Sequence, residues 1–181
     1  MTLEMKKLLA IILFTGLFIE SNAQTLTFTD FKLRESLPDW VMYITEQIKT
    51  ERAVCVDGTL NPFYLEADFN GDSVFDIALF VKEKATNKKG ILIIHGQSFK
   101  TYLIGAGGNF AHVGDNFKFL EIWKIYREND VALTVFSEDG DIEGNNIIKI
   151  DLPAIMVASS ESSSNLIIWE KNKYVWLHTG D

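Results

Sequence analysis

The spacing of the apolar residues beyond position 53 constrains the fold most strongly. From there to the C-terminus, short apolar or alternating runs are separated by Gly, Asn and Asp, a pattern typical of strands joined by tight turns. The runs predict strands over residues 54–56, 63–67, 77–82, 91–95, 100–104, 119–126, 131–136, 147–150, 155–159, 166–170 and 174–178. Because parallel strands would need helices between them, the pattern favours an antiparallel sheet or sandwich.

Two short stretches between these runs are predicted to close hairpins. Residues 87–90 and 171–173 combine Asn and Lys, the first with a following Gly, as tight turns between antiparallel strands do. The stretch 117–126 is less clear, because its large apolar residues suit a short helix nearly as well as a buried strand.

One helix is predicted ahead of the strands, over residues 37–51. Ser36 can cap its N-terminus, and Pro38 lies in the first turn, where a missing N–H costs nothing. Apolar residues then recur at helical spacing, at Trp40, Val41, Ile44 and Ile48. Without an internal repeat or a linker, the chain is predicted to form one mainly β (α+β) domain.

The first 23 residues are predicted to be a signal peptide. Lys6 and Lys7 precede an apolar run over residues 8–19, and small or polar residues follow up to Ala23, after which we expect cleavage. The alternative is a retained membrane anchor, but the run has about twelve residues where a span needs roughly 20. The mature chain, residues 24–181, is therefore expected to be secreted or periplasmic and free of the membrane.

Charge and cysteine content limit the classes of partner. The formal net charge is -8, from 25 acidic and 17 basic side chains, which removes the electrostatic attraction that nucleic-acid binding depends on. The single cysteine, Cys55, cannot form an internal disulfide and is interpreted as a buried thiol.

An acidic loop precedes the run at residues 77–82 and carries the main functional signal. Oxygen-bearing side chains occupy its first, third, fifth and ninth places, at Asp68, Asn70, Asp72 and Asp76. This spacing suits Ca²⁺, which takes six to eight oxygen ligands, and the carbonyl of Val74 and a water could complete the shell. The alternative is an ordinary turn, since Asp, Asn and Gly dominate turns anyway.

The flanks of this loop distinguish it from the helix–loop–helix calcium site. Its twelfth place holds Leu79 instead of Glu, and the neighbouring runs have the pattern of strands. Without a cation, three carboxylates within one turn would repel each other, so we expect metal binding and the folding of the loop to be linked.

Residues 66–81 resemble the FG-GAP/VCBS repeat family, in which a loop of the type D-x-[DN]-x-D-G-x-x-D connects neighbouring strands and binds calcium. The resemblance implies side-chain ligands at Asp68, Asn70, Asp72 and Asp76, and a carbonyl ligand at Val74. Ser73 replaces the usual Gly, which is expected to strain the loop if that position needs a left-handed backbone. Propellers of the family contain several such loops and this chain has one, so we expect residues 24–181 to be a single FG-GAP/VCBS-like β domain.

The remaining motifs have structural interpretations. Residues 138–144 alternate acids without the fourth ligand and are interpreted as a solvated hairpin tip, and residues 105–109 as a wide turn. His95, His112 and His178 have neither metal-type nor triad-type spacing. Trp169 and Trp176 could form a platform for sugar or peptide, but core packing is the favoured interpretation.

The sequence thus predicts an exported calcium-binding β-module with one N-terminal helix and a single calcium-loop hairpin. We interpret its role as structural or binding, with a protein or carbohydrate ligand and without catalytic residues. The alternative is a secreted hydrolase whose site is assembled from distant residues. A deep pocket beside the loop, with two or more titratable groups converging in it, would favour that enzyme.

Overall fold

The computed structural model describes residues 31, 33, 35–160 and 164–179, and the predicted signal peptide lies outside them. One helix, α3 (Asp39–Glu51), is followed by strands and a short 3-10 turn, η1 (Ala111–Val113). The strands are β1 (Val54–Val56), β2 (Tyr64–Ala67), β3 (Asp76–Glu83), β4 (Lys89–Ile94), β5 (Thr101–Gly105), β6 (Ile122–Tyr126), β7 (Asp130–Phe136), β8 (Ile142–Lys149), β9 (Ala154–Ala158), β10 (Asn165–Glu170) and β11 (Lys173–His178). The mainly β prediction is confirmed, and the ambiguous stretch 117–126 contributes the strand β6.

The start of α3 differs from the prediction. The helix begins at Asp39, and the carbonyl of Pro38 accepts hydrogen bonds from the N–H groups of Val41 at 2.9 Å and Met42 at 3.1 Å. No side chain caps this end, so the prediction of Ser36 as N-cap is wrong. The physical reason is Pro38, which disfavours the helical conformation in Leu37, the residue before it. The helix α3 therefore begins after the proline, and Ser36 lies too far ahead to cap it.

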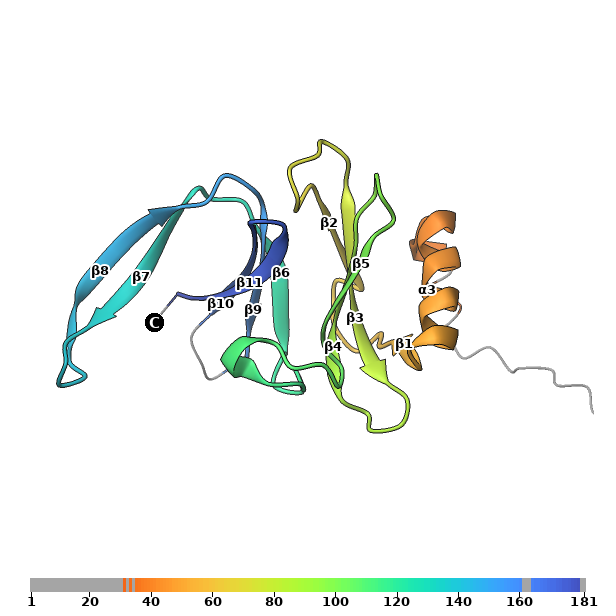
Figure 1. Cartoon of the computed structure of the whole chain (residues 1–181), viewed down its shortest axis with the longest axis horizontal. Helices are drawn as coiled ribbons and strands as arrows, with labels where there is room; N and C mark the ends of the chain where they lie inside the picture. Colours follow the sequence, from red (N-terminus) through yellow and green to blue (C-terminus); the bar gives the residue numbers. More distant parts are fainter. Residues whose placement is uncertain (1–30, 32, 34, 161–163, 180–181) are drawn as a thin grey trace, which may run out of the picture. The chain divides into compact units, whose positions relative to one another are not determined.

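The strands form three antiparallel sheets (Figure 1). The first has the order β1-β3-β4-β5, with β2 also paired to β3, and the second has the order β11-β10-β9-β6. The third is the two-stranded ribbon of β7 and β8. Both predicted hairpins are confirmed, since β3 pairs with β4 and β10 with β11 in antiparallel register.

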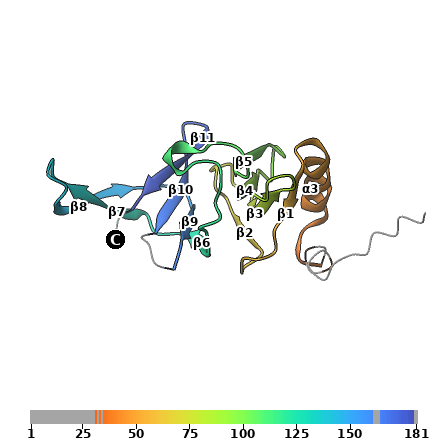
Figure 2. The same ribbon diagram turned by 90° about the horizontal axis from the view of Figure 1, so that it is seen from below.

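The first sheet is covered on both faces. On one face, Ile77, Leu79 and Leu92 share an apolar cluster with residues of α3. Figure 2 shows the helix beside this sheet. On the other face, Phe80 packs against Trp123 of the second sheet, with ring centroids 6.4 Å apart. This double burial explains why β3 reads as a continuous apolar run without alternation.

The second sheet turns its aromatic residues toward the first. The ring of Trp169 lies 4.9 Å from that of His95, just after β4, and 5.2 Å from that of Tyr102 on β5. Trp176 packs on Phe117, with centroids 5.9 Å apart. Both tryptophans are partly buried and pack against the core cluster, which agrees with the favoured interpretation of core packing.

The β7–β8 ribbon is exposed along most of β8. Ile142 and Ile147 on β8 are 68% and 66% exposed, and β8 begins earlier than the predicted run at 147–150. Val131 at the base of β7 is buried in a small cluster with residues of the second sheet. Among the described residues, no helix is both long enough and apolar enough to span a bilayer.

Candidate metal site

The acidic loop connects β2 to β3, which pair directly with each other. The register places Ala67 opposite Asp76, so the loop between them is the end of an antiparallel hairpin. Asp68 follows the last residue of β2, and Asp76 is the first residue of β3. The predicted ligands therefore lie at the edge of the first sheet, where a buried strand begins.

Asp76 has the most enclosed carboxylate of the loop, with 0% of its surface exposed. One oxygen accepts a hydrogen bond from the Phe69 N–H at 3.0 Å. The other accepts one from the Gly96 N–H, also at 3.0 Å. Because Gly96 follows β4, this carboxylate ties the loop to the neighbouring strand.

The electrostatic environment of Asp76 opposes its ionisation. Burial raises its pKa, the hydrogen bonds from Gly96 and Phe69 lower it, and the charges of Asp72 and Asp68 raise it again. The net result is a pKa of about 6, well above the ordinary 3.8. Asp68, Asp72 and Asp76 are thus close enough to act on each other electrostatically.

Asp68 organises the backbone at the tip of the loop. One of its oxygens accepts hydrogen bonds from the N–H groups of Gly71 at 2.7 Å and Asp72 at 3.1 Å. The other accepts from the Ser73 N–H at 2.9 Å. The backbone curls around this side chain, as the sequence pattern predicts for a tight loop.

Asn70 and Asp72 hold the second half of the curl. The Asn70 side-chain oxygen accepts from the Asp72 N–H at 2.8 Å, and its amide nitrogen donates to an Asp72 carboxylate oxygen at 3.0 Å. The other carboxylate oxygen of Asp72 accepts from the Val74 N–H at 2.9 Å. Each of these side chains therefore serves the folding of the loop whether or not a cation is present.

The curl requires two residues in the left-handed region. Gly71 has φ 80° and Ser73 has φ 68°. The second value confirms the expectation for the position where the FG-GAP/VCBS pattern has Gly. A left-handed conformation costs a residue with a Cβ on the order of 1 kcal/mol, so Ser73 stores strain at this point.

The donor set suits a hard cation, although the carboxylates are not gathered around one point. No group of three or more His, Cys, Asp or Glu side chains among the described residues is arranged to hold a metal. The side chains of Asp68, Asn70 and Asp72 instead accept the N–H bonds described above. A carboxylate oxygen has further lone pairs after it accepts one hydrogen bond, so these contacts leave capacity for a cation.

His95 and Tyr174 connect the loop to the core. They are both buried and hydrogen-bonded to each other, with 2.8 Å between the His95 Nε2 and the Tyr174 hydroxyl oxygen. Burial lowers the pKa of His95, whereas the charges of Asp72 and Asp68 raise it. Burial also raises the pKa of Tyr174, with a further contribution from Asp76.

Sequence reasoning missed the contribution of Gly96. A Cβ at this position would lie 2.1 Å from the carbonyl oxygen of Phe75, so only glycine lets β4 approach the loop this closely. The available signal was a glycine directly after an apolar strand, which often marks a close backbone approach.

Neither of two cavities in the described structure adjoins the acidic loop. One, of about 460 Å³, is lined by Asn61, Tyr64, Glu66 and neighbouring residues. The other, of about 630 Å³, lies along α3. The condition that would favour the hydrolase alternative, a pocket beside the loop with converging titratable groups, is not met by either cavity. Residues 138–144 are exposed, as predicted, but the hairpin tip is shorter than predicted, because Ile142 already begins β8. The Ser137 N–H donates to the Asp141 carbonyl at 2.8 Å and closes this tip.

Comparison of the chain with protein-family models, with curated proteins and with solved structures gives no match.

Proposed function

We propose that the protein is a calcium-binding β-module with a structural or binding role, in which the loop between β2 and β3 holds the ion. The supporting observation is a contrast between two buried carboxylates. Asp57 is 5% exposed and has a cation beside it, since the Lys89 Nζ lies 3.3 Å from its carboxylate oxygen. Burial raises the pKa of Asp57, but hydrogen bonding from Thr59 and the charge of Lys89 outweigh burial and hold that pKa below its ordinary value.

Asp76 is buried more completely and has the opposite surroundings. Within the described part of the chain, the charged groups that shift its pKa are Asp72 and Asp68, and no cationic side chain is among them. Ionising a carboxyl whose pKa has risen from 3.8 to about 6 costs the folded state on the order of 3 kcal/mol at neutral pH. A divalent cation in the loop would offset this cost and hold the carboxylate in its charged form.

The available donors favour calcium over softer metals. Carboxylate and amide side chains, at Asp68, Asn70, Asp72 and Asp76, and the Val74 carbonyl offer oxygen only, and oxygen is what calcium prefers. This set is also the one implied by the resemblance to FG-GAP/VCBS repeats. The ion would link the ends of β2 and β3 and, through the Asp76 contact with Gly96, the end of β4.

The proposed role depends on export, which the N-terminal sequence predicts. Extracellular calcium modules work with dissociation constants of about 10⁻⁴–10⁻³ M, so a strained loop such as this one can still be filled outside the cytosol. A net charge of -8 agrees with a protein or carbohydrate partner and not with nucleic acid.

Thermal unfolding tests the proposal. Purified protein is melted with excess CaCl₂ and with chelator, and the same is done for Asp72→Ala. At a calcium concentration about 100 times the Kd, binding adds about 2.7 kcal/mol, which corresponds to a rise in Tm of about 5–10 °C. The variant is expected to lose this response.

The matched control is Asp139→Ala, which removes a carboxylate from the exposed loop at residues 138–144. We expect this variant to respond to calcium as the native protein does. An equal Tm with calcium and with chelator in the native protein, together with no calcium heat in titration calorimetry, would end the proposal.

A further inference from the structure

A groove along α3 exposes aromatic side chains that other parts of the fold bury. The cavity of about 630 Å³ is lined by Trp40 and Tyr43 of α3 and by Phe99 of the β4–β5 turn, among others. Tyr43 is 68% exposed and Phe99 is 55% exposed. The rings of Trp40 and Phe99 lie 5.7 Å apart, so the helix and the turn present one joint aromatic surface. Exposed aromatic surface around a concavity is typical of a binding site.

The groove lies beside an edge strand with free backbone groups. The strand β5 ends the path β1-β3-β4-β5, and only β4 is paired with it in the described sheets. The His95 N–H donates to the Lys100 carbonyl, and hydrogen-bonded pairs alternate along an antiparallel ladder. The N–H and C=O groups of Thr101 and Leu103 therefore point away from β4, where an added strand could pair with them.

The side chains at this edge face the groove. Thr101 lines the cavity, and Leu103 packs in the cluster beneath α3. A strand paired to β5 would therefore direct alternate side chains into the groove, because residues opposite each other in neighbouring strands point to the same face.

Two carboxylates mark the ends of the groove. Asp39 and Glu51 are the first and last residues of α3 and both line the cavity. Its lining, within the described residues, includes neither Lys, Arg nor His. A rise of 1.5 Å per residue places these carboxylates about 18 Å apart along the helix.

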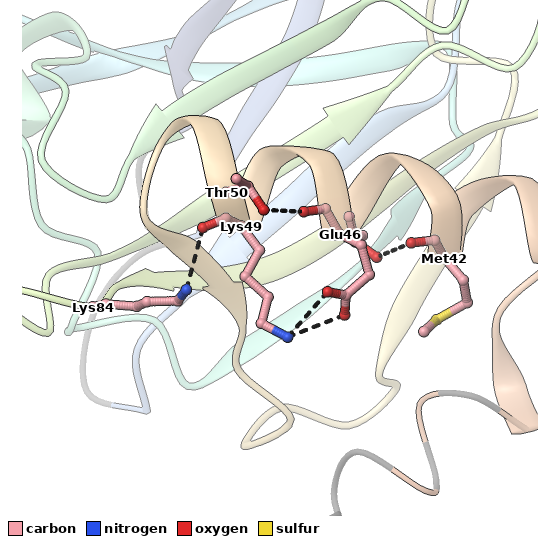
Figure 3. A network of polar contacts seen from close by, with 6 residues as sticks. Met42, Glu46, Lys49, Thr50 and Lys84 are labelled. Carbon is pink, nitrogen blue, oxygen red and sulfur yellow. Dashed lines mark hydrogen bonds and ion pairs between the residues drawn. The ribbon is translucent and has the colours of Figure 1, made fainter. Parts of the chain in front are cut away.

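The helix α3 and the strand β5 run in the same direction. The distance between the carboxylates of Asp39 and Glu51 along α3 is therefore also their distance along β5. Trp40, near the start of α3, contacts Phe99, just ahead of β5. At the other end, Lys84 donates a hydrogen bond to the carbonyl of Lys49 at 3.2 Å (Figure 3). Lys84 follows β3, and the register places the end of β3 at the same end of the sheet as Gly105, the last residue of β5. Glu46 lies on the outer side of α3 and is paired with Lys49, as Figure 3 shows.

We propose that this groove binds an extended, cationic segment of a partner protein, which adds a strand to the free edge of β5. Its apolar side chains enter the groove beside Trp40, Tyr43 and Phe99. Two basic residues six positions apart would lie on one face of that strand and about 20 Å from each other, which fits the carboxylates of Asp39 and Glu51. A second copy of this chain is disfavoured, because each copy carries a net charge of -8.

The site does not depend on the calcium proposal, since no residue of the loop 68–76 lines the groove. It is tested with ¹⁵N-labelled protein and the peptide Lys-Thr-Val-Thr-Val-Thr-Lys, with Glu-Thr-Val-Thr-Val-Thr-Glu as its charge-reversed control. We expect the basic peptide to shift the amide signals of Thr101 and Leu103 and the indole signal of Trp40. The acidic peptide is expected to bind roughly tenfold more weakly, and the difference should shrink as salt is added.

Charge reversal in the protein gives the sharper test. The double variant Asp39→Lys with Glu51→Lys should prefer the acidic peptide, whereas Glu46→Lys should keep the native preference because Glu46 lies outside the groove. Thr101→Pro removes an outward N–H that the fold does not use, and it should weaken both peptides while the remaining amide spectrum is unchanged.

Four results would overturn the proposal, three with the peptides and one with a sugar. The first is equal binding of both peptides to the native protein, and the second is an unchanged preference in the double variant. The third is no shift at Thr101, Leu103 and Trp40 up to about 5 mM of the basic peptide, which is a range that detects even weak docking. A response of Trp40 and Tyr43 to cellohexaose, without one to either peptide, would likewise overturn it and identify a carbohydrate site.

Discussion

Two acidic loops of this protein are similar in composition and have different surroundings. Both combine Asp and Gly and both end a hairpin, one between β2 and β3 and the other between β7 and β8. In the first, Asp76 is 0% exposed and the side chains of Asp68 and Asp72 accept backbone N–H bonds. In the second, residues 138–144 are all exposed.

The difference follows from the strand that comes after each loop. The first loop leads into β3, which is covered on both faces, so its last carboxylate is drawn into the core and its pKa rises. The second leads into β8, which is exposed along most of its length, so its acids stay in water. Acidic composition alone therefore does not set the electrostatics of a loop, because burial beside the first loop raises the pKa of its last carboxyl group.

Substitution of Gly96, whose N–H binds the carboxylate of Asp76 in the first loop, is expected to have the largest effect. In Gly96→Ala the new Cβ would meet the Phe75 carbonyl oxygen at 2.1 Å, so the backbone must shift and the Gly96 N–H must move away from Asp76. Overpacking and the loss of a hydrogen bond to a charged group together predict a loss of about 3 kcal/mol, measured by urea unfolding.

The matched change in the second loop is Gly140→Ala. Gly140 has φ 88° and no atom near the position of a Cβ, so the variant should cost only about 1 kcal/mol for the left-handed backbone. Equal losses in the two variants would show that the first loop is no more tightly held than the second.

An intermediate effect is expected from the competition between protons and calcium. The folded pKa of Asp76, about 6, is above its ordinary 3.8, so the folded state binds more protons between these values. Without calcium, this group therefore adds stability as the pH falls from 7 toward 4. Because calcium needs the ionised carboxylate, the Tm gain from calcium should shrink over the same range, roughly by half or more at pH 5.

His95 must be separated from this effect. Its pKa is lowered from 6.5, mainly by burial, so His95 takes up a proton at higher pH in the unfolded state than in the folded state. His95 therefore lowers the stability of the fold as the pH falls below 6.5. Because the charges of Asp72 and Asp68 act on His95 as well, the melts with calcium and with chelator are both repeated with His95→Gln, in which the pH dependence of the calcium gain comes from the loop alone. A calcium gain that stays constant from pH 7 to pH 5 would contradict the assignment of Asp76 as a ligand.

The strands and the acidic loop could be predicted because their signals are local. The run that becomes β3 and the Asp spacing just before it are both read from neighbouring residues. The early start of β8 was missed because residues 142–146 contain Gly and Asn, and only pairing with β7 makes them a strand. The start of α3 was missed because the effect of Pro38 on the preceding residue overrides the capping pattern.

Long-range contacts account for what the sequence could not predict at the sites. Gly96 reaches Asp76 from another hairpin, and Phe99 reaches Trp40 across the first sheet and its helix. No sequence motif marks either residue, because the register of β4 and β5 determines its contacts and its neighbours in the chain do not. The exposed aromatic groove could not be predicted from the spacing of apolar residues along the helix, because that spacing predicts only an amphipathic surface.

The smallest predicted effect concerns the strain at Ser73. Its φ of 68° is a conformation that glycine adopts freely, so Ser73→Gly should relieve the strain. Glycine also makes the unfolded chain more flexible, which offsets part of the gain and leaves a stabilisation of about 0.5 kcal/mol. Urea unfolding with chelator measures this directly. Titration with calcium tests whether the empty loop relaxes at Ser73, because the Kd of Ser73→Gly is tighter only if binding restores strain that the free loop has lost.

The reverse change in the second loop sharpens the comparison. Gly140→Ser places a Cβ at φ 88° in the loop at residues 138–144 and should lose about 1 kcal/mol with no change in calcium binding. If Ser73→Gly tightened calcium binding while Gly140→Ser left it untouched, the strain at Ser73 would be assigned to the metal loop and not to hairpin tips in general. A loss of stability in Ser73→Gly would instead mean that the serine side chain contributes a contact worth more than the strain it causes.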